Sequence, residues 1–334
     1  MPELKLTFAC STYDRMLALR TGDVKPEGID LEYKAIENPR AIFDRMGWKA
    51  EFDLSEFSST EYISRISRGD RSFVALPVFP SRVFRHGFIF VNRRRIARPQ
   101  DLNGKRIGIV LYTQTAMLWV RGMLASEYGV DPDTITWVEG SMRAAGAHGN
   151  PNPPKLLKAP RVVQNTSEKS LEQLLDEGEL DAVAGTRVPA CFGRNPDIVR
   201  LFPDFRAAER DYFKRTRIHP IMHLVAMKRE IHEAHPWAAA SLYKAFMAAK
   251  QRCYDMINIE VAPRYILPWL LADVEEMYEV FGRDPWPYGV QANRPTLEAL
   301  MRYMVEQHYL AKPLSLADLF VGETEWKGKA APAI

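Results

Sequence analysis

The sequence predicts an α/β fold that divides into two lobes, and three observations favour it. Residues 101–122 run from a turn through a short apolar strand into a polar elbow and then a helical pattern. Residues 4–92 repeat a similar strand-and-helix order four times. Apolar strands at 88–92 and 221–227 bracket the middle of the chain. The order strand, polar elbow, helix is typical of α/β folds.

The first block of elements follows from alternation and turn signals. Leu4, Leu6 and Phe8 alternate with polar residues, which predicts a first strand. Gly28 precedes the second strand, and the third ends in a polar elbow. The strands predicted in this block are 4–10, 29–36, 51–59, 73–79 and 88–92, and the helices are 16–21, 39–46 and 60–68.

The rest of the chain continues this pattern and then becomes helical. Helix 167–177 has an apolar face of leucines, with Thr166 or Ser167 as its cap and Gly178 at its end. Residues of the last helices recur at the 3.6-residue spacing of amphipathic helices. The further predicted strands are 106–110, 134–140, 180–188 and 221–227, and the further helices are one after Thr115, 167–177, 236–255, 266–281 and 295–309.

The two bracketing strands suggest where the lobes divide. Residues 1–91 and 221–334, with the C-terminal helices, are predicted to form the first lobe. Residues 92–220 are predicted to form the second. Strands 88–92 and 221–227 are expected to run side by side as a two-strand hinge.

Composition narrows the class of protein. The chain has 334 residues, 46% hydrophobic and 26% charged, with a net charge of +3, which fits a folded globular protein and gives no reason to expect nucleic acid as a partner. No apolar run is long enough for a membrane span. Cys10, Cys191 and Cys253 have neither metal-site nor disulfide spacing. With no signal-peptide pattern before Leu4, a cytoplasmic location is expected.

Five segments in order carry a family resemblance: FPSRVFRHG (79–87), YTQTAMLWVRG (112–122), TRVPACF (186–192), HPIMH (219–223) and DPWPYG (284–289). The order of elements resembles the type II periplasmic binding-protein fold. The five segments resemble the 4,5-dihydroxyphthalate decarboxylase family, which uses that fold.

This resemblance implies a ligand between the two lobes and a carbon–carbon lyase. The implied reaction is non-oxidative decarboxylation of a hydroxylated aromatic acid, 4,5-dihydroxyphthalate to 3,4-dihydroxybenzoate, in phthalate catabolism. The alternative is a non-catalytic binding protein of the same fold for an aromatic or other small carboxylic acid, because fold alone does not separate the two.

Basic and hydroxyl side chains are the candidates for binding the substrate. Guanidinium groups bind carboxylates bidentately, so Arg82 and Arg85 after a buried strand suit a dicarboxylate, with Arg187 as a third candidate. A solvated basic turn is the structural alternative. The remaining candidates lie at strand-to-helix elbows, where backbone N–H groups favour anions: Tyr13, Ser58, Ser59, Thr113, Gln114 and Thr115.

Two histidines are the candidates for delivering a proton to the ring. His86 and His223 lie at the two bracketing strands, and a group that titrates near neutral pH is an efficient donor. Their structural alternatives are a turn residue and a core histidine. Glu56 or Asp14 is expected to hold the substrate hydroxyl, although Asp at such an elbow is commonly a helix cap.

No cofactor is expected for this reaction. His219 and His223 share one face of an extended segment and leave a divalent metal as an alternative, without a third ligand in the sequence. A small aromatic carboxylate is the expected partner, and the oligomeric state stays open.

Overall fold

The computed structural model describes residues 3–146, 154–259, 261 and 264–321. The chain forms two compact units. The described residues of the first come from Met1–Arg82, His223–Leu297 and Leu314–Ile334, and those of the second from Val83–Met222 and Glu298–Pro313. The second unit thus includes 83–91, 221–222 and 298–313, which the sequence pattern assigns to the first lobe.

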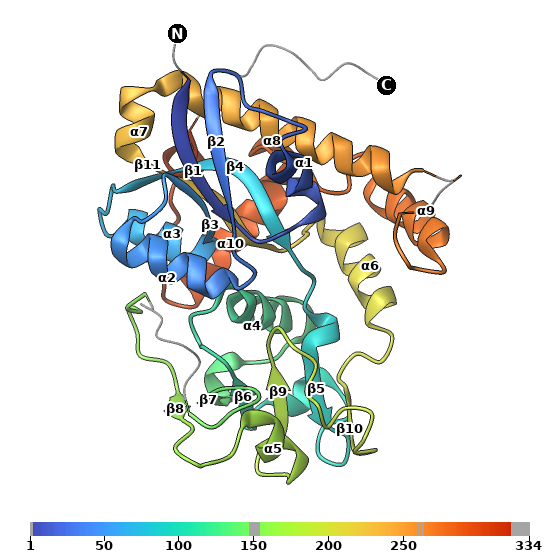
Figure 1. Ribbon diagram of the computed structural model, residues 1–334. Coiled ribbons are helices and arrows are strands. Elements are labelled where there is room, and N and C mark those ends of the chain that lie inside the picture. The colour runs from blue at the N-terminus through green and yellow to red at the C-terminus, as the bar shows by residue number, and fades with distance from the viewer. Residues whose placement is uncertain (1–2, 147–153, 260, 262–263, 322–334) are drawn as a thin grey trace. The chain divides into compact units, whose positions relative to one another are not determined.

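The first unit is built on a five-stranded sheet in the order β2-β1-β3-β11-β4. Strand β1 is parallel to β2 and β3, whereas β11 is antiparallel to β3. Helix α2 packs against β3, and the long helix α8 packs against β4 and α1 (Figure 1). The strands are β1 (Leu4–Cys10), β2 (Ile29–Ala35), β3 (Leu54–Ser58), β4 (Phe73–Arg82) and β11 (Ile221–Lys228). The helices are η1 (Asp14–Met16), α1 (Leu17–Thr21), α2 (Pro39–Lys49), α3 (Ser59–Ser67), α7 (Arg229–Ala234), α8 (Pro236–Ile257), α9 (Leu270–Phe281), η5 (Gln291–Asn293) and α11 (Leu316–Leu319).

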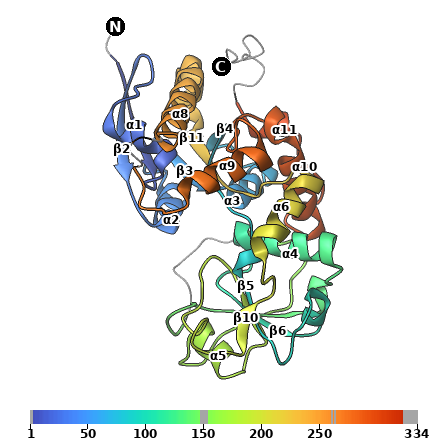
Figure 2. The ribbon, with the colours of Figure 1, turned by 90° about the vertical axis from the view of Figure 1, so that its right-hand side faces the viewer.

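The second unit is built on a six-stranded sheet in the order β10-β5-β9-β6-β7-β8. Helices α4 and α5 lie toward opposite ends of this unit in both views (Figure 2). The strands are β5 (Ile89–Asn92), β6 (Arg106–Ile109), β7 (Thr136–Glu139), β8 (Val162–Gln164), β9 (Ala182–Ala184) and β10 (Ile198–Arg200). The helices are η2 (His86–Phe88), η3 (Pro99–Leu102), α4 (Thr115–Tyr128), η4 (Pro132–Thr134), α5 (Leu171–Asp176), α6 (Phe205–Thr216) and, from Glu298 onward, α10 (Arg294–Glu306).

The predicted hinge pairing is wrong. Strand β5 belongs to the sheet of the second unit, and β11 belongs to that of the first, where its neighbours are β3 and β4. Strand β4 is longer than predicted because it continues past Pro77 and Pro80 to Arg82. It lies at the edge of its sheet, where a proline removes no hydrogen bond from a central ladder.

Local packing confirms the α/β prediction and most of its elements. The leucine face of α5 is buried in the core of the second unit, with Phe90, Val183 and Ile198. The cap of α5 is Ser170, which accepts from Gln173 N, rather than Thr166 or Ser167, because the helix begins at Leu171. Strands β8 and β10 and helices α6 and α7 were not predicted. Within 3–146, 154–259, 261 and 264–321, no helix is long and apolar enough to cross a membrane.

Candidate active site

Strand register brings Glu56 and His223 together in the first unit. In the antiparallel pair of β3 and β11, His223 lies opposite Ser58 and Val225 lies opposite Glu56. Because side chains alternate along a strand, Glu56 and His223 share one face as diagonal neighbours, within reach of long side chains. Glu56 Oε1 lies 2.5 Å from His223 Nδ1.

Glu56 is the centre of a hydrogen-bonded cluster. Its side chain is fully buried. Oε1 also accepts from the Tyr13 hydroxyl at 2.6 Å, and Oε2 accepts from Ser11 N at 3.1 Å and more weakly from Cys10 Sγ at 3.6 Å. Burial alone would raise the pKa of Glu56, but His223, Tyr13 and Ser11 together leave it below its usual value. The carboxylate is therefore ionised at neutral pH.

The His223 ring is hydrogen-bonded to Glu56 at Nδ1, and its other nitrogen, Nε2, is unpaired among the described residues. Its ring packs edge-on against Phe43 of α2, with centroids 4.8 Å apart. Its side chain is 18% exposed, and Nε2 receives no hydrogen bond from the residues that the structure describes. A carboxylate at Nδ1 favours the tautomer that keeps a proton there. Nε2 is thus available to exchange a proton with a bound molecule.

His86 lies in a different setting, in the second unit. Its ring is fully buried among Tyr128, Phe202 and Tyr212, with centroid distances of 5.1 to 5.9 Å. Burial, with a smaller effect of Arg215, lowers the pKa of His86 to about 4. A neutral, enclosed imidazole is a poor proton donor, so the geometry favours His223 between the two candidates.

Arg82 is bonded within the first unit. It is buried, and Nη2 donates to the carbonyl of Pro287 at 2.7 Å and to the Asn293 side chain. Asn293 in turn donates to the carbonyls of Pro287 and Gly289. These contacts favour a structural role, in which Arg82 fixes the loop before η5.

Replacing Arg82 by methionine is therefore expected to lower the free energy of unfolding by about 2–3 kcal/mol, because buried acceptors lose a charged donor. Urea unfolding measures this change. Arg20→Met, at an exposed position of α1, is the matched control. An unfolding free energy equal to that of the control would contradict the structural role.

Arg85 is a buried cation without an acidic partner in contact. It is 5% exposed, and among the described residues its donors reach only Gly185 O at 3.4 Å and Met222 Sδ at 2.7 Å. Its Nε has no hydrogen bond, and none of the described carboxylates lies within ion-pair distance of it. Burial lowers the pKa of Arg85 to about 9, and Glu209 acts in the opposite direction. A buried guanidinium in this state is stabilised by any anion that reaches it.

The other predicted residues lie at the elbows or on the surface. Ser58 caps α3 by accepting from Glu61 N, and Ser59 begins that helix. Thr113, Gln114 and Thr115 lie at the N-terminus of α4, whose cap Gln114 makes no side-chain capping bond. Asp14 is exposed and accepts from its neighbour Arg15, apart from the Glu56 cluster. Arg187 lies exposed in the bend after β9, bonded to no other described residue.

The described residues contain no group of three or more His, Cys, Asp or Glu side chains that could hold a metal ion. His223 pairs with Glu56, and the ring of His219 stacks on Phe84 at 4.7 Å.

Several contacts of the Glu56 cluster and its surroundings were not predicted from the sequence. Cys10 and Ser11 contact Glu56 directly. The guanidinium of Arg15 lies 4.2 Å from the ring centroid of Tyr13 and 4.3 Å from that of Trp286. The DPWPYG segment, which holds Trp286, carries part of the family resemblance, but no local sequence pattern indicates that it lies beside Tyr13.

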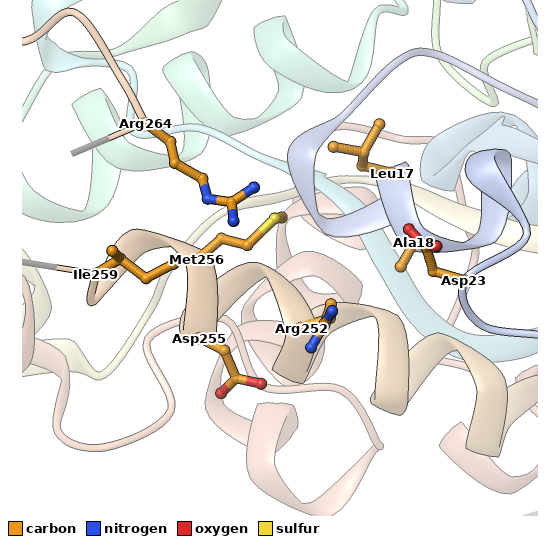
Figure 3. Close-up of a pocket in the computed structure, with 8 residues that line it drawn as sticks. All are labelled: Leu17, Ala18, Asp23, Arg252, Asp255, Met256, Ile259 and Arg264. Carbon is orange, nitrogen blue, oxygen red and sulfur yellow. The ribbon is translucent and has the colours of Figure 1, made fainter. Parts of the chain in front are cut away.

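A separate pocket of the first unit lies between α1 and the C-terminal end of α8 (Figure 3). It combines apolar side chains with two arginines and two aspartates and shares no member with the Glu56 cluster. Its lining residues are Leu17, Ala18, Asp23, Arg252, Asp255, Met256, Ile259 and Arg264.

Comparison with solved structures supports the fold. The periplasmic aliphatic sulphonate binding protein SsuA from Escherichia coli matches with a TM-score of 0.53 at 12% identity, covering 96% of this chain and 98% of that one. A putative sulfonate-binding SsuA from Methylobacillus flagellatus matches with the same TM-score and identity, covering 96% and 92%. The type II binding-protein-like fold predicted from the order of elements is confirmed.

Comparison with known sequences identifies the family. A family model described as NMT1/THI5 like matches residues 25–148. A 4,5-dihydroxyphthalate decarboxylase from Pseudomonas putida is 36% identical over 219 residues, which is 64% of this chain and 83% of that protein. The 4,5-dihydroxyphthalate decarboxylase from Comamonas testosteroni is 34% identical over 329 residues, which is 96% of this chain and 97% of that one. Similar to such a relative along nearly its whole length, the chain belongs to the 4,5-dihydroxyphthalate decarboxylase family.

Proposed function

We propose that this protein is a carboxy-lyase that converts 4,5-dihydroxyphthalate to 3,4-dihydroxybenzoate and carbon dioxide. Family membership supports the reaction class, because both relatives carry that activity in their names. The observation that carries the mechanism is the pair of a buried, ionised Glu56 and a partly exposed His223, 2.5 Å apart. Such a pair suits proton transfer at neutral pH.

The chemistry needs one proton delivered to carbon. Each carboxylate of the substrate is para to a hydroxyl, so the ring can take a proton at the carbon that bears the departing carboxylate. The bond from that carbon to the carboxylate then breaks, its electron pair returns to the ring, and aromaticity is restored. The aromatic ring itself accepts and returns the electrons, which is the basis for proposing that no cofactor takes part.

We assign the proton delivery to His223. Glu56 holds Nδ1 and stabilises the imidazolium, while Nε2 carries the proton that is delivered. The role proposed here for Glu56 differs from the predicted one, in which Glu56 holds the substrate hydroxyl. Both of its oxygens already accept hydrogen bonds within the first unit, so Glu56 acts as a positioning residue for His223.

Arg85 is the strongest candidate for binding a substrate carboxylate. A buried guanidinium with unfilled donors binds an anion more strongly than an exposed arginine such as Arg187. The carboxylate that departs must not be stabilised more in the ground state than in the transition state. We therefore propose that Arg85 holds the carboxylate that stays. A role in phthalate catabolism and a cytoplasmic location remain proposals that go with this function.

The test is to incubate the purified protein with 4,5-dihydroxyphthalate and to follow carbon dioxide release with and without a chelator. Turnover in deuterated water is expected to place one deuterium on the ring carbon that lost its carboxylate. Equal rates with chelator would support a metal-free reaction, and loss of activity would support the metal alternative. Tight binding of the acid without any carbon dioxide would overturn the proposal in favour of the binding-protein alternative.

A further inference from the structure

Arg15 lies between two aromatic rings next to the Glu56 cluster. Its guanidinium carbon is 4.2 Å from the ring centroid of Tyr13 and 4.3 Å from that of Trp286. A cation over an aromatic face is attracted by the ring quadrupole, and the planar guanidinium also stacks on the ring. Arg15 thus joins the elbow after β1 to the loop between α9 and η5.

The N–H donors of Arg15 bind groups of the protein itself. Nε donates to the carbonyl of Pro80 at 2.7 Å, Nη2 donates to the same carbonyl, and Nη1 pairs with Asp14 at 3.0 Å. Its side chain is only 14% exposed. This arrangement suits a residue that fixes its neighbours better than one that binds a ligand carboxylate.

Trp286, one of the two rings on which Arg15 packs, is fixed by hydrogen bonds. Trp286 Nε1 donates to Phe79 O at 2.8 Å, Trp286 N donates to the Tyr254 hydroxyl at 2.9 Å, and Lys250 donates to Trp286 O at 3.1 Å. Lys250 also pairs with Asp284 at 2.6 Å. The Trp286 ring is therefore a fixed surface against which Arg15 packs.

Tyr13 has weaker anchors of its own. Its hydroxyl donates to Glu56, and the short helix η1 that follows has no side-chain cap. Arg15 packs on the ring of Tyr13 and restricts the rotation of that side chain. We propose that Arg15 is a positioning residue of the decarboxylation site: packed against Trp286, it holds the phenol of Tyr13 on Glu56 and so fixes the hydrogen-bonded unit of Tyr13, Glu56 and His223.

This inference rests on the proposed function only for its effect on turnover. The geometry also predicts an effect on the titration of the His223 imidazole in the ligand-free protein, because the Tyr13 hydrogen bond favours the ionised form of Glu56. Losing that bond raises the pKa of Glu56 and leaves more of its negative charge to stabilise protonated His223. The other titratable groups facing Glu56 are Cys10 on β1 and, through Cys10, Tyr33 on β2.

The experiment compares Tyr13→Phe, Arg15→Met, Arg15→Lys and the double variant Tyr13→Phe with Arg15→Met. The first readout is the NMR pH titration of the His223 imidazole without ligand, and the second is the pH profile of kcat and KM. Tyr13→Phe is expected to move the imidazole titration to higher pH. Arg15→Met is expected to move it the same way, and the double variant is expected to match Tyr13→Phe alone.

Turnover gives a second signature. Arg15→Met is expected to lower kcat about threefold to tenfold, the scale of one hydrogen bond, with little change in KM. Arg15→Lys keeps the charge but loses the planar stack, and it is expected to fall between wild type and Arg15→Met. Arg20→Met, on the exposed side of α1, is expected to behave as wild type.

Two results would overturn the inference. One is a wild-type imidazole titration in folded Arg15→Met or Arg15→Lys while Tyr13→Phe shifts it. The other is an additive shift in the double variant, since Arg15 would then act independently of Tyr13. If no variant and no wild-type protein releases carbon dioxide, the proposed function fails, and the ligand-free titration still decides the role of Arg15.

Discussion

Replacing His223 by asparagine is expected to cut turnover at least about a hundredfold while leaving acid binding nearly unchanged, the scale of general-acid catalysis. Asparagine can still donate a hydrogen bond to Glu56, so the buried carboxylate keeps a partner. It cannot carry a titratable proton to the ring carbon. Single-turnover carbon dioxide release and calorimetric titration with the substrate measure the two effects separately.

Two further variants test whether the loss of turnover is specific to His223. His86→Asn is expected to retain turnover in whatever fraction stays folded, because His86 is enclosed by aromatic rings. His235→Asn, whose ring packs near Trp237 in the first unit, is the matched control for loss of an imidazole. Wild-type turnover in His223→Asn would rule out His223 as the proton donor, and loss of turnover in folded His86→Asn alone would move that role to His86.

Replacing Arg85 by methionine is expected to weaken substrate binding by about 2–5 kcal/mol, the usual cost of removing one partner of a buried charge pair. The same change is not expected to lower the melting temperature. In the ligand-free protein the buried guanidinium makes only weak contacts, and removing an uncompensated buried charge relieves its desolvation. Calorimetry with the substrate and thermal unfolding measure the two effects.

The control is Arg94→Met, which removes an exposed guanidinium of the second unit that pairs with Asp197. It is expected to leave both binding and melting temperature unchanged, since exposed ion pairs contribute little. Undiminished affinity in Arg85→Met would rule out the carboxylate role. A parallel loss in Arg187→Met would instead restore Arg187 as a binding residue.

Much of the fold follows from local sequence. Strand β1 alternates clearly enough to be placed at its observed bounds, and the leucine face of α5 is the one that is buried. Strand β4 was predicted to end at Phe79, where the apolar run gives way to a basic segment, but it continues to Arg82 at the edge of its sheet.

The candidate site was predictable in its residue types but not in its pairings. Glu56 and His223 are 167 positions apart, and their contact depends on the register of β3 against β11, which no local pattern specifies. The burial of His86 was not predictable for a similar reason. Its burial depends on α6, a helix that the sequence pattern did not reveal, and on aromatic residues from two other segments. The hydrophobic periodicity of one segment carries no information about such distant partners.

The register of β3 and β11 constrains chain length as well as side chains. A strand that slips by one residue turns every side chain to the opposite face of the sheet. A single insertion or deletion between His223 and Met227, or between Leu54 and Ser58, would therefore leave Glu56 and His223 present in the sequence. Their side chains would then face opposite sides of the sheet. In proteins that perform the same chemistry on this scaffold, these two short segments should align without gaps even where their individual residues vary.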